Sequence, residues 1–498
     1  MAFALSPAQA QPVTDLQADI AIYGGTSAGV IAASAARKCG KTDTGNKGAI
    51  TGLSRKFYQD VGARYGINES WNFEPHVAQA VYERYLHDPG IRVLLDMVLI
   101  KAEKKKTEIR SITINGVGDS AGRRYRVHAG QYLDCTYEGD LLAKAHVSFT
   151  LGRESNAQYG ETIDGVQLAH YHQFPDGVDP YRIPGDPASG LVWGISRGKL
   201  MAAGTGDKKI QAYNFRICLT DSARNSIPIT RPEGYDSTRY ELLVRLIRAQ
   251  PKKRSLNQYF IWSRMPNRKT DVNNRGGFST DMIGANYGWP TGDYATRQKI
   301  FQAHLQYTKG LLYFWGHDPR VPEVMRREML KWGYPRDEYP LTDHFTPALY
   351  VREGRRMIGE YVMTEHNCRG AVTVDDGVAM ASYNMDSHNC QRIVVNGMVK
   401  NEGDVEVHVP HPFPVSYRSL TPRRSECTNL LVPVCLSATH IAYGSIRMEP
   451  VFMELGQAAA VAAALAIHGR RTVQQIDVSR LVRDLRQDPY LEHYSRDK

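Results

Sequence analysis

An apolar run, a glycine turn and an alanine-rich helix follow one another directly near the N-terminus. Residues 18–23 (ADIAIY) predict a buried strand, and residues 30–39 predict a helix. The turn between them consists of Gly24, Gly25, Thr26, Ser27, Ala28 and Gly29. Such a turn aims backbone N–H groups and the positive end of a helix dipole at a diphosphate. This order therefore predicts an α/β domain of the Rossmann type that binds a nucleotide.

The spacing of the turn departs from the full G-x-G-x-x-G pattern at one position. Thr26 stands where the second glycine is expected, while Gly24 and Gly29 keep their places. The two retained glycines allow the tight turn and the close packing of helix on strand. We expect the Thr26 hydroxyl to donate to a phosphate, although its side chain narrows the approach.

The second strand of a Rossmann unit is missing from the sequence. Such a strand is apolar and ends about 20 residues beyond the turn in an acidic residue that binds the ribose. Residues 39–48 (CGKTDTGNKG) contain neither an apolar run nor an acidic strand end. Asp43 is the only nearby carboxylate, and it lies in a polar loop.

The rest of the chain consists of segments with a regular apolar pattern on either side of a loop-rich middle. Residues 91–100, 109–114 and 125–133 predict a three-stranded meander, and regular pattern returns at 430–434 and in a helix from about 450 to 468. The predicted organisation is a leader (1–16), a nucleotide-binding domain made from both chain ends (17–150 and 425–470), an inserted loop-rich α+β substrate domain (151–424), and a C-terminal helix and tail (471–498).

Composition excludes several partners. The net charge is +10, but the basic residues are scattered, so nucleic acid is not expected. No stretch reaches the ~18 apolar residues that span a bilayer. The seven cysteines include no CxxC, which argues against an iron–sulfur cluster and leaves buried thiols and one disulfide as alternatives. Residues 8–10 (AQA) resemble a signal-peptidase site, so we expect a periplasmic or secreted protein; a disordered alanine-rich leader is the alternative.

Six segments together resemble one family. The chain is similar over nearly its whole length to the bacterial FAD-dependent oxidoreductases that include many sequences labelled xanthan lyase, and distantly to the flavin subunit of heterodisulfide reductases. The segments that carry the resemblance are 22–29 (IYGGTSAG), 73–76 (FEPH), 134–140 (DCTYEGD), 352–356 (REGRR), 385–389 (MDSHN) and 440–450 (HIAYGSIRMEP).

The resemblance implies FAD as cofactor and hydride transfer from an organic substrate to flavin N5. The expected substrate is a small molecule, a sugar or an oligosaccharide. It implies FAD contacts at Thr136, Gly444, Ser445 and Met448 in addition to the glycine turn. The family's pattern has about twenty more residues between Lys41 and Thr42, which would carry the second strand and a glycine-rich loop. The alternatives are a polysaccharide lyase or hydrolase without net redox chemistry, and a non-catalytic variant with impaired FAD binding.

Two pairs of residues are candidates for acid/base chemistry. His440 and Arg447 lie at the segment that would contact the flavin. Asp386 and His388 alternate along an extended segment, so both side chains point the same way and the carboxylate can orient the imidazole. Residues 352–356 are expected to form structural ion pairs between domains, with an acidic substrate as the sharper alternative role. The spacing of the residues indicates no metal site. The sequence does not indicate an oligomeric state.

Overall fold

The glycine turn lies between a strand and a helix, as its sequence predicts. In the computed structural model, which describes residues 13–35, 47, 50 and 52–487, strand β1 (Thr14–Tyr23) leads through the turn into helix α1 (Ser27–Ala35). Strand β1 pairs in parallel with β4 (Arg124–Asp134), with Tyr23 opposite Asp134. Among the described residues, β1 has a partner strand on one side only.

The predicted meander is confirmed. Strands β2 (Met97–Lys105) and β3 (Glu108–Gly116) are antiparallel, and β3 pairs antiparallel with the first half of β4. The sheet order is β1-β4-β3-β2. The first strand begins at Met97 rather than at residue 91, because residues 91–95 have no strand partner and are largely exposed.

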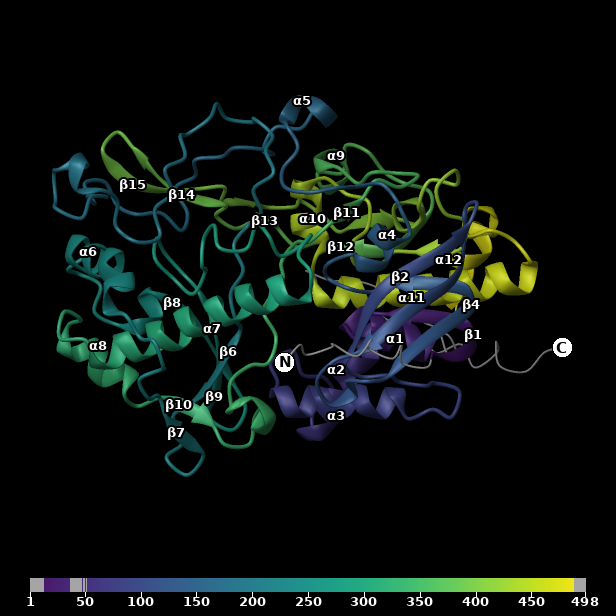
Figure 1. The fold of residues 1–498 in the computed structure, drawn as a ribbon, viewed down its shortest axis with the longest axis horizontal. Coiled ribbons are helices and arrows are strands. Elements are labelled where there is room, and N and C mark those ends of the chain that lie inside the picture. Colours follow the sequence, from purple (N-terminus) through teal and green to yellow (C-terminus); the bar gives the residue numbers. More distant parts are fainter. Residues whose placement is uncertain (1–12, 36–46, 48–49, 51, 488–498) are drawn as a thin grey trace, which may run out of the picture.

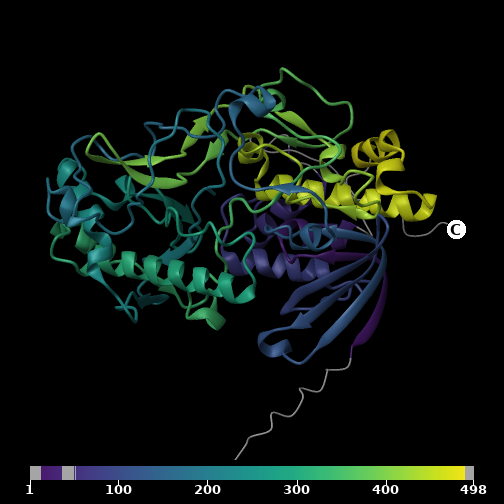
Figure 2. The same ribbon diagram turned by 45° about the horizontal axis from the view of Figure 1, so that its top comes forward.

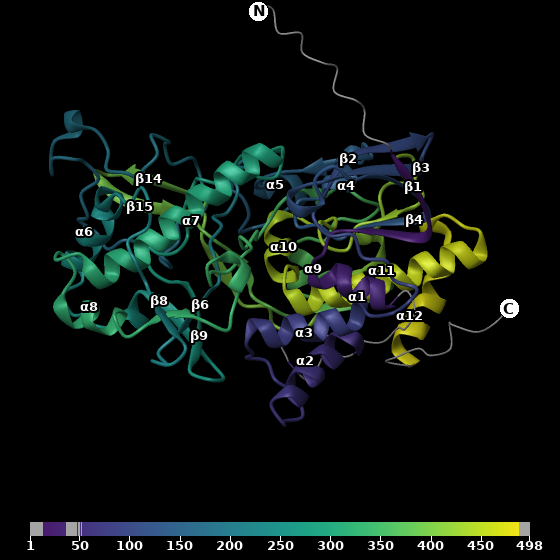
Figure 3. The ribbon, with the colours of Figure 1, turned by 60° about the horizontal axis from the view of Figure 1, so that its bottom comes forward.

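Both ends of the chain meet on strand β4. The short strand β18 (Leu430–Leu431) pairs in parallel with Tyr132 and Leu133, at the carboxyl end of β4. Helix α11 (Glu449–Gly469) crosses α1, and the two helices lie side by side in Figures 1 and 3. A Cβ on Gly456 would stand 2.3 Å from the carbonyl oxygen of Ala28, so this crossing requires glycine.

Helix α11 forms where a helix is predicted at about 450–468, but it changes the expectation that no stretch is apolar enough to span a bilayer. By length and composition it could cross a membrane, but 83% of its most apolar window is buried inside the protein. It packs against α1, α2 (Gly52–Arg64) and β12 (Gly377–Ala381), and α12 (Val478–Gln487) covers its end. An alanine-rich helix in the centre of a core meets the same criterion, because burial on all sides selects apolar residues all round.

The loop-rich middle of the chain builds a second sheet. Its order is β7-β10-β6-β9-β8, and its hydrophobic core is separate from the one around α11 (Figure 2). The strands are β6 (Ile217–Thr220), β7 (Ser226–Pro228), β8 (Phe260–Met265), β9 (Lys269–Asn274) and β10 (Gly333–Pro335), with helices α6 (Glu241–Ala249), α7 (Tyr294–His317) and α8 (Glu323–Met329).

Short elements connect the two parts. The strand pairs are β5 (Phe149–Thr150) with β11 (Arg356–Met357), β12 with β17 (Phe413–Ser416), β13 (Met385–Ser387) with β16 (Val405–Val407), and β14 (Gln391–Val395) with β15 (Met398–Glu402). The helices α3 (Pro75–Leu86), α4 (Asp140–Lys144), α5 (Asn156–Tyr159), α9 (Glu365–Cys368) and α10 (His440–Ile446) complete the described fold.

The structure adds to three expectations. Residues 440–446, in the segment expected to contact the flavin, form α10, because Thr439 caps the helix by accepting the N–H of Ala442. Residues 352–355 belong to no helix or strand, and β11 begins at Arg356. The six described cysteines are free and buried, so they form no disulfide with one another. Residues 1–12, and the junction between Lys41 and Thr42 where the second strand is missing, lie outside the described residues.

Candidate functional site: the glycine turn and a buried ionic cluster

The glycines of the turn are required for different reasons. Gly24 has a φ of +116°, and a Cβ there would stand 2.5 Å from the carbonyl carbon of Cys135. A Cβ on Gly29 would stand 2.0 Å from the carbonyl oxygen of Gly24. Both are therefore needed to pack the turn onto the end of β4. Gly25 differs, because its missing Cβ faces open space with no atom within 4 Å.

The Thr26 side chain points inward. Its hydroxyl donates to the carbonyl of Cys135 at 2.7 Å and accepts the N–H of Gly29 at 3.3 Å. A hydroxyl has a single proton. In this conformation the hydroxyl therefore ties the turn to β4, and its donation to a phosphate stays a prediction.

A carboxylate stands at the first turn of α1. Glu449, the first residue of α11, accepts hydrogen bonds from the hydroxyls of Ser27 and Tyr137, the latter at 2.6 Å. Burial raises the pKa of Glu449, and the two hydroxyls act in the opposite direction. The first N–H groups of a helix have no intrahelical acceptors and favour negative charge. The position occupied by this carboxylate is thus suited to an anion.

Thr136 is beside the glycine turn but is engaged in its own loop. Its hydroxyl donates to Asp134 at 2.7 Å and accepts the N–H of Gly139 at 2.9 Å. Its backbone nitrogen would lie 2.6 Å from a Cβ on Gly24. The next helix, α4, has Gly139 at its cap position, and Asp140 forms ion pairs with Arg297 and Arg355.

Gly444 and Ser445 lie within α10. Gly444 packs against β13, and Ser445 contacts the residues that precede this strand. A Cβ on Gly444 would stand 2.5 Å from the carbonyl oxygen of Asp386, so the glycine accommodates this backbone. The hydroxyl of Ser445 donates to the carbonyl of Tyr383. Met448 caps α11 and is partly buried against the core around that helix. These three residues hold α10 and α11 in place around β13.

Three of the four candidate acid/base residues form one buried cluster. Asp386 and His388 point to the same side of the extended segment, as predicted, with Nε2 of His388 3.7 Å from Oδ2 of Asp386. Arg447 donates to the same oxygen at 3.0 Å. Although burial raises it, the pKa of Asp386 lies well below its ordinary value because His388 and Arg447 stabilise the carboxylate.

The cluster continues into the second sheet's domain. Nδ1 of His388 lies 2.8 Å from Oδ2 of Asp281, and Oδ1 of Asp281 is 2.9 Å from Nη2 of Arg352. Burial raises the pKa of Asp281, but Arg352 and His388 outweigh it and lower that pKa. The imidazole is therefore held between two ionised carboxylates.

His440 lies on the other side of β13. Its Nε2 is 2.8 Å from the hydroxyl oxygen of Ser387, and its Nδ1 is 2.8 Å from Oε2 of Glu353. Glu353 also accepts from Arg356, which pairs with Glu154. Burial opposes ionisation, yet His440 and Arg356 lower the pKa of Glu353 to about 2. The expected structural ion pairs of residues 352–356 are confirmed.

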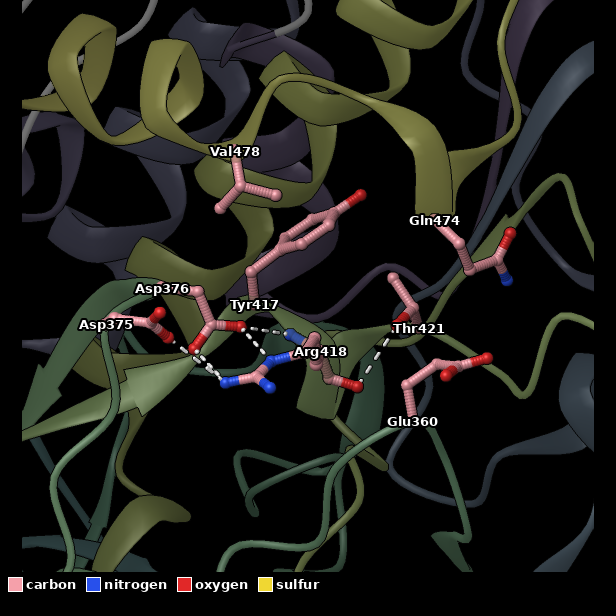
Figure 4. A pocket seen from close by; sticks show the side chains of 8 residues that line it. All are labelled: Glu360, Asp375, Asp376, Tyr417, Arg418, Thr421, Gln474 and Val478. Atoms are coloured by element: carbon pink, nitrogen blue, oxygen red, sulfur yellow. Dashed lines mark hydrogen bonds and ion pairs between the residues drawn. The ribbon is translucent and has the colours of Figure 1, made fainter.

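Two cavities of the described chain differ in their relation to the candidate site. The larger, about 340 Å³, lies between α12 and the turn after β17. Figure 4 shows Arg418 in it, held by Asp375 and Asp376 at 3.2 and 2.9 Å. None of the candidate site residues lines it. The second, about 190 Å³, is lined by Asp281 of the ionic cluster, together with Trp193, Tyr307 and Arg392.

Comparison with known proteins identifies the family. The fold and the site define a mixed α/β enzyme with a nucleotide-type glycine turn, and a family model described as FAD dependent oxidoreductase matches residues 39–485. The chain belongs to this family, is an FAD-dependent oxidoreductase, and uses FAD as cofactor. The match begins after the glycine turn, so the family assignment does not depend on the turn.

Solved structures are more distant. The chain is similar to an anhydrotetracycline hydroxylase, OxyS, from Streptomyces rimosus, at 10% identity over 34% of this chain and 40% of that one, with a TM-score of 0.20. It is also similar to a point mutant of the E. coli quinol fumarate reductase FrdA, at 10% identity over 91% and 72% of the two chains, with a TM-score of 0.26. The chain thus spans less than half of the hydroxylase. No curated protein matches.

The turn fits the diphosphate of FAD. Gly25 opens to free space, and the end of α1 already accommodates the carboxylate of Glu449. The residues that would hold the diphosphate are Gly25 in the turn and Ser27 and Ala28 at the start of α1, through their backbone N–H groups.

Sequence reasoning missed two residues of the site. Asp281 and Arg392 come from segments without local periodicity, and their partners are distant in sequence. Arg392 follows His388 by four residues, which was the one available hint. Glu449 lies in the segment 440–450 that carries the family resemblance, but its contact with Ser27 of α1, 422 residues away, has no local signal.

Proposed function

We propose that the chain oxidises an organic substrate, a sugar or oligosaccharide in the first instance, beside an FAD held by both chain ends. In this proposal β1, β4 and β18, with α1 and α11, form the Rossmann-type half, and the second sheet's domain supplies the substrate side. The parallel pairing of β4 with β1 and β18 supports this arrangement. FAD, when bound, accepts the hydride that the substrate gives up.

His388 is the residue to which we assign proton transfer. Asp281 holds its Nδ1 at 2.8 Å and so leaves Nε2 as the nitrogen that would exchange the proton. Asp386, 3.7 Å from Nε2, stabilises the imidazolium that forms when a substrate hydroxyl loses its proton. The observation that carries the proposal is this imidazole between two ionised carboxylates, next to a cavity. Arg447 keeps Asp386 ionised and in position.

A hydrolase or lyase is the competing function, and one arrangement favours it. Ser387, His440 and Glu353 are linked in the order of a nucleophile, a base and an orienting acid. However, Ser387 is fully buried and also bonds the carbonyl of Gly403 at 3.0 Å. A nucleophile must reach its substrate, so we assign these three residues to positioning α10 against β13.

The test is anaerobic reduction of the FAD-loaded protein by a panel of sugars and sugar acids. The loss of visible flavin absorbance measures the reduction. We expect His388→Asn to slow reduction about 10²- to 10⁴-fold while bound FAD stays constant. His408→Asn, at an exposed histidine, is the matched control and should reduce at the normal rate. Cleavage of glycans by colourless protein, or normal reduction by His388→Asn, would contradict the proposal.

A further inference from the structure

The smaller cavity contains an arginine without an acidic partner. Arg392 is 3% exposed, and its guanidinium forms no ion pair with a carboxylate of the described residues. The other buried arginines of this region differ, since Arg352 pairs with Asp281 and Arg447 with Asp386. A buried cation without a counter-charge is costly, and an anion in contact with it recovers that free energy.

Hydrogen bonds hold Arg392 in place but do not use all of the N–H groups of its guanidinium. Nε donates to Asn401 at 2.9 Å, and the two Nη atoms donate to the carbonyls of Gly194 and Gly277 at 3.4 and 3.1 Å. A guanidinium has five N–H groups, so two find no acceptor among the described residues. The rings of Phe174 and Phe278 flank the group at 5.4 and 5.1 Å. Burial lowers its pKa to about 10, so it remains charged at neutral pH.

Two aromatic side chains also line the cavity. Trp193, 36% exposed, stacks on Tyr307 with 5.7 Å between ring centroids. The remaining lining consists of Gly194 and residues 282–285, of which Met282 and Ile283 have large apolar side chains. A volume of about 190 Å³ admits a small molecule rather than a polymer. Aromatic faces favour flat, apolar ligand parts.

The cavity also borders the proposed acid/base group. Asp281 lines it and bonds His388 on its other side. The ionic cluster and Arg392 together contain three guanidinium groups, from Arg352, Arg392 and Arg447, against the two carboxylates of Asp281 and Asp386. Of these three guanidinium groups, Arg392 is the one without an ion pair to a carboxylate of the described residues.

We propose that this cavity binds a small organic carboxylate, whose carboxylate pairs with Arg392 and whose flat part lies on Trp193. With this ligand as the substrate, the inference rests on the proposed function and restricts the substrate class of that function to organic acids.

The test is calorimetric titration of the purified full chain with benzoate and with benzamide, its neutral analogue of the same shape. We expect benzoate to bind and benzamide to bind at least 10-fold more weakly. Arg392→Gln should weaken benzoate binding about 10- to 100-fold, because a charge-assisted contact is lost. Trp193→Leu, at a half-exposed position that does not support the core, should weaken it about 2- to 10-fold.

Arg197→Gln removes an exposed charge from the same loop and should bind benzoate normally. Equal binding of benzoate and benzamide, or benzoate binding that is unchanged in both Arg392→Gln and Trp193→Leu, would overturn the inference. Inorganic phosphate that displaces benzoate at equal concentration would also overturn it, since the site would then recognise charge alone. Flavin content is measured separately: benzoate binding without FAD would contradict the proposed function alone, and FAD binding without benzoate binding would contradict the carboxylate site alone.

Discussion

Nδ1 of His388 and Oδ2 of Asp281 lie 2.8 Å apart, although 107 residues separate them in sequence. Asp281 belongs to the domain of the second sheet, while His388 follows β13, which packs on α10. Both residues belong to the inserted region (151–424), and the contact joins the second sheet's domain to the segment of that region that packs on the C-terminal helix α10. The ionic cluster consequently depends on the placement of both parts of the molecule.

The crossing of α1 and α11 depends on Gly456. Gly456→Val should lower the free energy of unfolding by about 1–3 kcal/mol or more, because the new side chain meets the backbone of Ala28. Gly469→Ala in the same helix is the control, since its nearest would-be contact is 3.5 Å away on the side chain of Arg471. We expect Gly469→Ala to be neutral or stabilising. Denaturant unfolding of both variants measures the difference, and equal stability would refute the crossing.

Thr26 should act through packing rather than through phosphate binding. Thr26→Ser keeps the hydrogen bonds to Cys135 and Gly29 and should unfold like the natural protein. Thr26→Val loses both and should be less stable by about 1–2 kcal/mol. Thermal unfolding in the absence of FAD distinguishes the two. If Thr26→Val unfolds normally but loses FAD affinity, the hydroxyl serves the cofactor instead.

The low pKa of Glu353 predicts a dependence of stability on pH. A carboxyl group with a pKa of about 2 in the folded chain and about 4.5 when unfolded stabilises the fold above pH 4.5, and this contribution disappears as the pH falls toward 2. At neutral pH it is on the order of 3 kcal/mol. Glu353→Gln should therefore be destabilised at pH 7, with a gap from the natural protein that narrows below pH 4.5. A constant gap between pH 7 and pH 3 would show that ionisation is not the cause.

Glu449 places a negative charge where α1 would receive the diphosphate. Glu449→Gln removes that charge and should bind FAD about 2- to 5-fold more tightly, as expected for a like charge removed from a helix N-terminus. Glu406→Gln, at an exposed position, should have no effect. Fluorescence titration with FAD measures both. Weaker binding by Glu449→Gln would mean that the carboxylate is a ligand for the cofactor rather than a competitor.

The local parts of the fold could be predicted from sequence. The strand–turn–helix at 18–39 and the meander that ends in β4 follow from apolar periodicity and glycine spacing, which are properties of short segments. The alternation of Asp386 and His388 was equally local. Helix α10 was missed because its seven residues, all buried, show no polar face to give a periodic signal.

The non-local parts could not be predicted. Asp281 and Arg392 acquire their roles only when the second sheet's domain folds against β13, and no spacing in the sequence encodes that contact. The inward turn of Thr26 was also hidden, since it depends on the carbonyl of Cys135, 109 residues away. Gly444 was expected to contact FAD; its close neighbour in the structure is the backbone of Asp386, and the FAD contact stays a prediction.

The affinity of the purified protein for FAD, compared with that of Gly25→Val, tests the central claim most directly. Gly25 faces open space, so the substitution leaves the packing of the turn intact while filling the side from which the diphosphate approaches. The account predicts saturable FAD binding by the natural chain, at least tenfold weaker binding by Gly25→Val, and the same unfolding midpoint for both apoproteins. Absence of saturable binding, or equal affinity of the two proteins, would contradict it.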